Sequence, residues 1–239
     1  MTPVHHRRLQ LKTQLLQQIE TLEPEDAILP AEHPAIDQII CELETLNPID
    51  QPLRPEHWPM LLGSWALVYA SRGTVVTRRI GRQFPLPVGI QRVWQRLTSP
   101  ESTGAAMLKD QSLEAIAKDR GSGALVFDRP LRAIAKDQHL GAIATENGAV
   151  LSLPFLGELT ATAQGIWQPF EEGESARVSF GAFSVQATRL LGITGLNLPQ
   201  ITVPVLEFLR QEALWITSYL DEDLRFGRGA TGNLFVFRR

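Results

Sequence analysis

Three glycines near the end of the chain could form a nucleotide-binding loop. Gly227, Gly229 and Gly232 fit the dinucleotide-binding pattern G-x-G-x-x-G. That pattern functions between a strand and a helix, with an acidic residue about 20 positions further on. The given sequence ends at Arg239 and leaves no room for the helix or the acid. We therefore interpret these glycines as turning the chain between two strands.

The acidic run before these glycines could provide paired carboxylates for acid–base catalysis. It consists of Asp221, Glu222 and Asp223. Its position between two predicted strands also suits a turn, in which aspartate accepts backbone hydrogen bonds. Arg225 and Arg228 are close enough in sequence to neutralise it. The structural interpretation is favoured over the catalytic one.

Histidine and cysteine give no catalytic or metal-binding pattern. The five histidines lack metal-ligand spacing, and neither H-E-x-x-H nor G-x-S-x-G occurs. We therefore expect no catalytic residues, no metal and no cofactor. Cys41 is the single cysteine and lies beside an apolar helix stripe, which favours a packed structural thiol.

Bulk properties restrict the partners and the location. The 239 residues, 44% hydrophobic and 21% charged, indicate a globular protein with a real core. The net charge of −3 gives no basic field for a nucleic acid. No transmembrane helix, signal peptide or transit peptide is evident, so we expect a protein that stays in the compartment where it is made.

The first 60 residues are predicted to be a helical segment followed by a connector. Leu11, Leu15 and Leu22, with Leu16 and Ile19, form a stripe that ends at Pro24. A second stripe follows Pro34 and ends at Asn47-Pro48; it comprises Ile36, Ile39, Ile40, Leu43 and Leu46. Four prolines in residues 47–59 indicate a stiff connector into the next unit.

Residues 61–239 have the sequence pattern of an antiparallel β protein. Trp65, Leu67 and Tyr69 alternate with smaller residues, and the last strands form a meander. Apolar parity reverses across Gly181, which predicts a β-bulge there. These short strands indicate a sandwich or a barrel. The aromatic residues would then be core or would line a cavity, and both interpretations stay open.

An insertion with a nine-residue period interrupts the strands at about 103–147. Its copies include EAIAKD at 114–119 and RAIAKD at 132–137. Glycines and Pro130 argue against one long helix, so short hairpin strands fit better. The simplest interpretation is a local duplication without an activity of its own. An uncharged stretch, Leu190 to Leu206, is a candidate membrane-facing loop or cavity lid.

Three segments resemble the plastid lipid-associated proteins, or fibrillins. Residues 62–71 (LGSWALVYAS) are similar to their opening strand, and residues 155–167 (FLGELTATAQGIW) to their central strand pair. Residues 219–225 (YLDEDLR), followed by Arg228-Gly229, resemble their C-terminal signature. The pattern departs at Phe226-Gly227, where the family usually has Ile-Ser, and in the nonapeptide insertion.

This resemblance implies a lipocalin-like antiparallel β-barrel, preceded here by two N-terminal α-helices. It implies non-catalytic binding of a small hydrophobic molecule, such as a carotenoid, quinone or prenyl lipid. By analogy with lipocalins, Trp65 would stack with Arg225 or Arg238. The candidate ligand-binding residues are Trp65, Tyr69, Trp167, Trp215, Tyr219, Asp221, Asp223 and Arg225.

The resemblance also implies a peripheral location at a thylakoid membrane, on its cytoplasmic face, or at lipid globules (plastoglobules). Without a transit peptide, it is consistent with a cyanobacterial member. Two alternatives stay open. One is a structural coat protein without a ligand cavity, and the other is a lipocalin-like enzyme that uses Asp221 or Asp223 with Arg225.

Overall fold

The fold is known from a computed structural model. Most of the nonapeptide insertion, up to residue 140, lies outside the described residues, and so does most of the stretch from 190 to 206. The structure describes residues 2–28, 33–71, 89–99, 141–153, 157–170, 172–190, 193–194, 201–204, 213–230 and 232–239.

The N-terminal part is helical, as the stripes predict. Helix α1 spans Pro3–Glu20 and α3 spans Pro34–Thr45, with the short α2 (Pro24–Ile28) between them. The apolar stripes of α1 and α3 are buried, and the proline at the start of each helix removes an amide that would lack a partner. Both predicted helices are confirmed.

The connector folds onto one end of the β structure. It contains a 3₁₀ turn, Pro55–His57, and helix α4, Trp58–Leu61. Leu53 donates its backbone N–H to the carbonyl of Gly173 at 2.8 Å, and Trp58 Nε1 donates to the carbonyl of Leu53 at 3.0 Å. These bonds hold the proline-rich segment against the loop between two strands.

Eight antiparallel strands close into a barrel, which confirms the predicted fold class. The order around the barrel is β4-β3-β2-β1-β10-β9-β8-β5, and pairing of β4 with β5 closes the ring. Two shorter strands, β6 (Ile193–Thr194) and β7 (Ile201–Pro204), pair with β5 outside this ring. The strands of the ring are β1 Gly63–Ala70, β2 Gly89–Thr98, β3 Ile143–Leu153, β4 Gly157–Pro169, β5 Ser175–Leu190, β8 Ala213–Leu220, β9 Leu224–Gly229 and β10 Leu234–Arg238.

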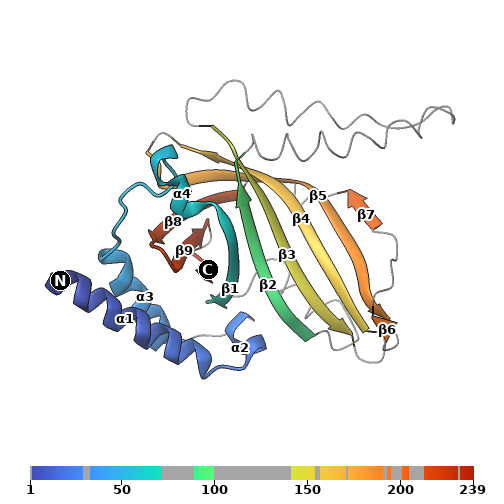
Figure 1. The fold of residues 1–239 in the computed structure, drawn as a ribbon, viewed down its shortest axis with the longest axis horizontal. Helices are drawn as coiled ribbons and strands as arrows, with labels where there is room; N and C mark the ends of the chain where they lie inside the picture. Colours follow the sequence, from blue (N-terminus) through green and yellow to red (C-terminus); the bar gives the residue numbers. More distant parts are fainter. Residues whose placement is uncertain are drawn as a thin grey trace.

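The helices cover one outer side of the barrel. Figure 1 shows α1 and α3 beside β8, β9 and β1, with α2 near one end of the barrel. Leu11, Leu15 and Leu43 of the helices form one core with Phe226 and Val236 of the strands. Since this core lies under the helices, it marks the outer face of the barrel wall. A second core, which includes Trp65, Leu67, Trp167 and Phe237, occupies the opposite, inner face.

Bulges decide which side chains face inward. On β1 the register shifts between Leu67 and Tyr69, and on β8 it shifts between Thr217 and Tyr219. Each shift leaves one residue, Val68 or Ser218, without a direct partner and reverses the parity of the strand beyond it. The two tyrosines therefore join the outer core under the helices.

The predicted bulge at Gly181 is confirmed. Gln164 pairs with Ala182 and Gly165 pairs with Phe180, so Gly181 has no partner on β4. The extra residue keeps apolar side chains of β5 on one face on both sides of the bulge. Glycine suits this position because it weakens a regular strand least where the ladder is already interrupted.

Two local predictions are wrong. Cys41 is exposed rather than packed, because α3 buries Ile39, Ile40 and Leu43 and turns Cys41 to the side. Gly227 does not turn the chain but lies inside β9. The turn between β9 and β10 instead uses Gly232, which has a φ of +76° and donates its N–H to the carbonyl of Gly229 at 2.8 Å.

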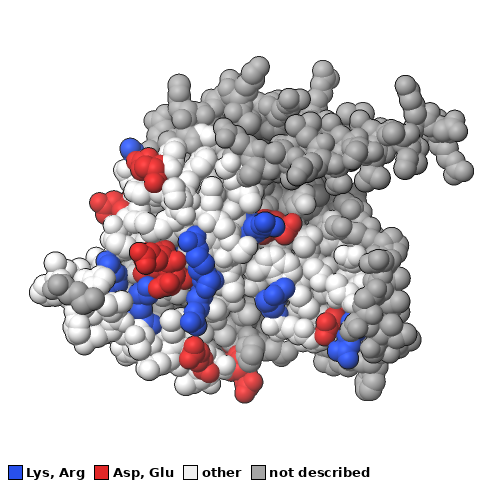
Figure 2. Space-filling model, in the orientation of Figure 1, with Lys and Arg blue, Asp and Glu red and all other residues white. Residues whose placement is uncertain are grey.

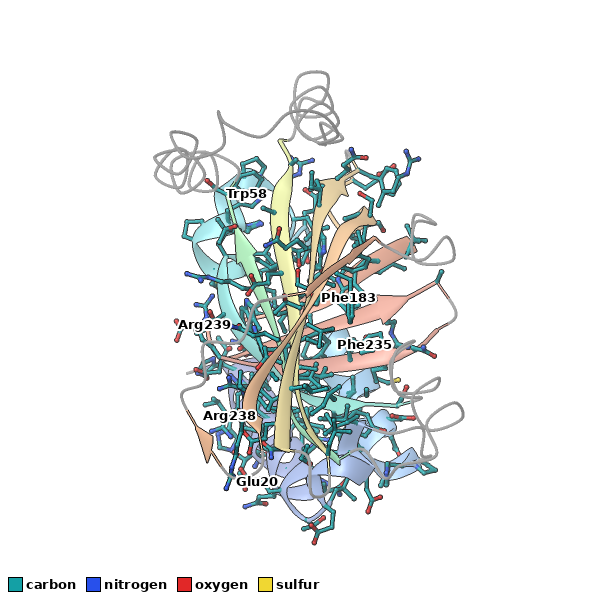
Figure 3. The ribbon with its side chains drawn as sticks, turned by 90° about the vertical axis from the view of Figure 1, so that its right-hand side faces the viewer. Glu20, Trp58, Phe183, Phe235, Arg238 and Arg239 are labelled. Carbon is teal, nitrogen blue, oxygen red and sulfur yellow. The ribbon has the colours of Figure 1, made fainter. Side chains whose placement is uncertain are left out.

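The surface carries charges of both signs. Figure 2 shows acidic and basic side chains next to each other on the face with the helices, rather than a field of one sign. In Figure 3, Trp58 and Glu20 lie toward opposite ends of the molecule, with Arg238 and Arg239 between them. None of the described helices is both long enough and apolar enough to cross a bilayer.

Candidate functional site

Four of the eight predicted site residues lie on the inner face of the barrel. They come from four strands: Trp65 from β1, Trp167 from β4, Trp215 from β8 and Arg225 from β9. Trp65, Trp167 and Arg225 are buried, and Trp215 is half-buried against the same core. Barrel closure therefore brings together residues that are up to 160 positions apart (225 − 65 = 160).

Arg225 lies in a box of aromatic rings. Its guanidinium carbon is 4.4 Å from the ring centre of Phe237, 5.1 Å from that of Trp65 and 5.6 Å from that of Trp167. Trp215 extends the box, because its ring lies 5.5 Å from that of Trp167. We refer to Arg225 and these four rings as the arginine box. Each ring face carries partial negative charge and attracts the cation.

The predicted contact between Trp65 and Arg225 is confirmed. Arg238, the alternative partner predicted for Trp65, instead forms an ion pair with Glu20 at 3.5 Å. Arg239 takes the second place over Trp65, 4.5 Å from its ring centre, and donates to the carbonyls of Met60 and Leu62. Arg239 thus ties the end of the chain to the segment that precedes β1.

Polar side chains of β2 and β3 are linked to Arg225 by hydrogen bonds. Arg225 Nη2 donates to Gln95 Oε1, and Gln95 Nε2 donates to Asn147 Oδ1 at 2.8 Å. Thr145 Oγ1 lies 3.4 Å from the same Asn147 oxygen. Arg225 Nε and Nη1 are buried and have no acceptor among the described residues, and the same holds for Trp167 Nε1. Three buried nitrogens, which carry four N–H groups, thus have no acceptor among the described residues.

The guanidinium of Arg225 is a buried cation without a counterion in the described part of the chain. Its exposed fraction is 0%, and the ion pairs of the described residues do not include it. Burial, followed by repulsion from Arg239, lowers the pKa of Arg225 to about 9. The group therefore stays charged at neutral pH and carries a large desolvation cost.

Gly227 gives the arginine box its shape. A Cβ at this position would overlap the indole ring of Trp215, so only glycine allows that ring to lie flat on β9. Trp215 Nε1 donates to Thr217 Oγ1 at 3.3 Å, which fixes the orientation of the ring. Gly227 is thus a close-approach glycine of the barrel interior.

Beyond the arginine box, the inner face of the long strands carries small side chains. Ala149 of β3 pairs with Ala161 of β4, and Ala163 follows at the next inward position. These alanines share a face with the buried Trp167 because the β3–β4 ladder has no register shift. They nevertheless remain half-exposed, whereas Trp167 is buried. These alanines are thus small, partly exposed side chains on the inner face, next to larger ones such as Phe183, which pairs with Ala163.

The other four predicted residues lie at the seam between the helices and the outer barrel wall. This seam comprises Tyr69, Tyr219, Asp221 and Asp223. Tyr69 donates to Asp37 of α3 at 2.8 Å, and Tyr219 donates to Asp221 at 2.6 Å. The Asp223 side chain is 69% exposed. The barrel wall separates these residues from the arginine box.

Asp221 has a full set of partners at this seam. Lys12 of α1 lies 2.8 Å from its Oδ2, and the backbone N–H groups of Asp223 and Leu224 donate to its Oδ1 at 2.9 and 2.8 Å. Tyr219 provides the fourth bond. The acidic run therefore forms a turn, as predicted. Its neutralising cation, however, is Lys12, because Arg225 faces inward and Arg228 pairs with Glu44 at 2.6 Å.

The electrostatics of the seam oppose acid–base catalysis by Asp221. Burial alone would raise the pKa of Asp221, but the bonds from Lys12, Tyr219 and the two backbone N–H groups together lower it. Burial and the neighbouring carboxylate raise the pKa of Tyr219. Asp221 is thus a stable carboxylate whose acceptor positions are occupied, which suits a structural role.

Comparison with known proteins gives a family match over part of the chain. The model of the PAP_fibrillin family matches residues 9–117. This match covers a little under half of the chain. It confirms the resemblance that the sequence motifs indicate.

The PAP/fibrillin match has a different extent from those motifs. It includes α1 and α3, which lie before the segment of resemblance, together with Trp65 and Tyr69. It ends before Asp221 and Arg225. The N-terminal helices therefore belong to the matched region.

The chain is also similar to a curated protein, probable plastid-lipid-associated protein 5, chloroplastic, of Arabidopsis thaliana. It is 31% identical over 70 residues, which are 29% of this chain and 29% of the relative. The alignment thus spans less than a third of that relative. No solved structure matches this chain.

The sequence interpretation did not identify two residues that contact the predicted site residues. Gln95 lies between Val93 and Leu97 on the apolar parity of β2, and a polar residue in that position was the available signal. Lys12 gave no signal, because a lysine between Leu11 and Leu15 on a helix normally faces solvent. It is half-buried here because α1 packs against the turn after β8.

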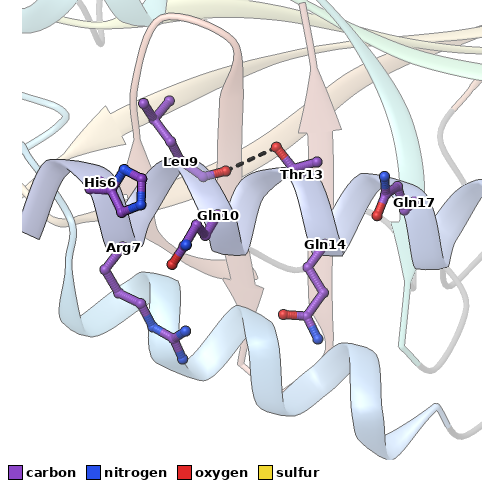
Figure 4. Close-up of a pocket in the computed structure, with 7 residues that line it drawn as sticks. All are labelled: His6, Arg7, Leu9, Gln10, Thr13, Gln14 and Gln17. Carbon is purple, nitrogen blue, oxygen red and sulfur yellow. Dashed lines mark hydrogen bonds between the residues drawn. The ribbon is translucent and has the colours of Figure 1, made fainter.

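A surface depression on α1 offers no comparable chemistry. It lies on the helix side that carries His6, Gln10 and Gln14, and Figure 4 shows these side chains around it. Its only drawn hydrogen bond joins Thr13 Oγ1 to the carbonyl of Leu9 within the same helix. The described residues contain no group of three or more His, Cys, Asp or Glu that could hold a metal ion.

Proposed function

We propose that this PAP/fibrillin chain binds one small hydrophobic molecule inside its barrel and does not transform it chemically. The proposed ligand classes are carotenoids, quinones and prenyl lipids. The proposal rests mainly on one observation, the half-exposed alanine face of β3 and β4 next to the buried arginine box. A barrel of eight strands is wide enough to hold one small ligand.

The energetics of a lipid ligand suit such an interior. Each buried methylene contributes about 0.8 kcal/mol, whereas association costs roughly 4–15 kcal/mol. A long apolar chain can therefore offset the cost of association through contact with alanine and aromatic side chains alone. Ala149, Ala161 and Ala163 leave room for such a chain where larger residues would fill the barrel.

The same proposal places the protein peripherally at a lipid surface, such as a thylakoid membrane or a lipid globule. The family and the name of the Arabidopsis relative support an association with lipid structures. The absence of a membrane-crossing helix among the described residues is compatible with a peripheral position. The candidate membrane-facing stretch from 190 to 206 remains part of this proposal.

A structural coat protein is the second candidate function. It is favoured by the outer seam, where Lys12, Asp221 and Tyr219 form a satisfied network of the kind that builds a rigid body. A coat protein needs no ligand in its interior. The two functions therefore differ in whether a lipophilic molecule accompanies the purified protein.

The test is expression in a photosynthetic host, followed by native mass spectrometry and solvent extraction. We expect a bound lipophile with wild type and at least a tenfold smaller amount with Ala161→Trp, because the indole would occupy the interior. Thr162→Trp is the matched control, since Thr162 lies on the opposite face of the same strand. A well-folded wild type that carries no lipophile and does not bind added carotenoid or quinone would favour the coat protein.

A further inference from the structure

The arginine box contains a combination of groups that the proposed binding of a lipophile does not yet use. Its charged centre, Arg225, is completely buried, and two of its nitrogens have no acceptor within the described residues. Trp167 Nε1 is also buried without an acceptor. The guanidinium carbon lies 5.6 Å from the Trp167 ring centre, so the two side chains that carry these donors are neighbours.

Unpartnered donors of this kind are rare in folded proteins. Buried polar groups almost always have a hydrogen-bond partner, and a buried charge normally has a counterion. Gln95 uses only one of the guanidinium nitrogens, and its own amide is engaged by Asn147. After its contacts with the described residues, the box therefore retains a positive charge and three donor nitrogens without an acceptor.

The chemistry of these groups specifies the complementary ligand group. Every unpartnered atom is a donor, so the ligand must provide acceptors. The second arginine, Arg239, lies over the other part of Trp65 and adds positive charge. A cation or a donor-only group is thus disfavoured. A carboxylate offers two oxygens and negative charge, and its hydrogen bonds to arginine are among the strong ones.

The surroundings specify the remainder of the ligand. Phe237, Trp65 and Trp167 enclose the guanidinium, and their faces exclude water from it. The inward alanines of β3 and β4 continue from Trp167 along the same face of the ladder. A molecule with an acidic head at Arg225 would therefore place an apolar chain against Ala163 and Ala161.

We propose that the barrel interior binds a lipophilic carboxylic acid, with its carboxylate accepting hydrogen bonds from Arg225 and Trp167 Nε1. This inference rests on the proposed function, and it narrows the ligand from any lipophile to one with an acidic oxygen head. The ligand neutralises the guanidinium and occupies the free donors. Its chain extends along the inner face of β4 toward Ala163 and Ala161.

The experiment compares palmitate with methyl palmitate, which has the same chain but no charge. Binding to the purified, delipidated full chain is measured by isothermal titration calorimetry and by quenching of tryptophan fluorescence. We expect wild type to bind palmitate at least about tenfold more tightly than the ester, since hydrogen bonds to charged groups are worth that much or more. Arg225→Met should remove this preference and retain binding of the ester.

Two further variants make the result independent of a folding defect. Trp167→Phe keeps an aromatic ring but lacks the indole donor, and we expect it to weaken palmitate binding severalfold without affecting the ester. Arg238→Met is the matched control, because Arg238 is exposed and pairs with Glu20 on the outer surface. It should leave both affinities unchanged.

The outcomes separate this inference from the proposed function. Equal affinity of wild type for palmitate and its ester, unchanged by Arg225→Met and Trp167→Phe, would overturn the acidic head group but leave lipophile binding in place. Binding of neither probe, combined with the absence of a co-purified lipophile, would overturn both. A preference for the acid that disappears in Arg225→Met and weakens in Trp167→Phe supports the inference.

Discussion

Asp221 and Arg225 lie four positions apart in the chain, and both are buried, with exposed fractions of 8% and 0%. Asp221 faces the helices and receives bonds from Lys12, Tyr219 and two backbone N–H groups. Arg225 faces the barrel interior and has one hydrogen-bond acceptor, Gln95. These two charged groups are close in sequence, but partners compensate the charge of Asp221 and leave that of Arg225 largely uncompensated.

This difference distinguishes a structural charge from a functional one. A buried charge with a complete set of partners is part of the scaffold. Removing the charge or one of its partners leaves buried polar groups uncompensated and destabilises the fold. A buried charge that lacks partners costs stability in the free protein and gains it when a ligand provides them. The outer seam thus has the properties of a scaffold, and the arginine box has those of a binding site.

The largest expected effect is at the seam. Asp221→Ala leaves Lys12, Tyr219 and two backbone N–H groups without their acceptor, so we expect a loss of about 3–5 kcal/mol in the free energy of unfolding. Urea unfolding followed by circular dichroism measures it. Glu222→Ala, at the exposed neighbouring position, should change the value by no more than about 0.5 kcal/mol. A loss below about 1 kcal/mol for Asp221→Ala would contradict the structural role.

A smaller effect is expected when the charge of the arginine box is removed. Arg225→Met replaces a buried cation without a counterion by an apolar side chain of similar length. The free energy of unfolding of the ligand-free protein should stay within about 1 kcal/mol of wild type. The same urea titration provides the measurement. A loss as large as that of Asp221→Ala would make Arg225 a scaffold residue and remove the contrast between the two regions.

The smallest effect concerns pH. The folded-state pKa of Asp221 is lowered, so its contribution to stability is present above its unfolded pKa of about 3.9 and is lost as the pH falls through the folded value. Lys12 and Asp223 face this carboxylate and stay present in both proteins compared. We therefore expect the stability difference between wild type and Asp221→Asn to be constant from about pH 6 to pH 5 and to shrink as the pH falls further to about 3. Urea unfolding across this range measures the difference, and a constant difference would show that Asp221 does not titrate with a lowered pKa.

Much of the fold could be predicted because it depends on local patterns. The leucine and isoleucine stripes predict α1 and α3, since burial at a helical period needs no information from distant residues. The parity reversal at Gly181 predicts the bulge in β5 for the same reason. The Gly-x-Trp strand and the contact of Trp65 with Arg225 came from the resemblance to lipocalin-like proteins.

The candidate site could be predicted only in part. The eight proposed residues belong to two separate regions of the molecule, the arginine box and the outer seam, but the sequence placed them in one. Tyr69 has the same strand parity as Trp65, so alternation alone assigns both to one face. The position of Lys12 against Asp221 depends on how α1 packs, which no pattern near either residue encodes.

The sequence by itself determined the helices, the strands of the closing meander and the presence of aromatic residues with an arginine near the C-terminus. Helical and strand periods arise from interactions between residues close in the chain, so they can be read locally. Only the tertiary structure decided the sides of the barrel wall. The shifts at Val68 and Ser218 depend on pairing with β10 and β9, and closure of β4 on β5 fixes the register of the whole ring. That is why Arg225 faces the interior while Asp221 faces the helices.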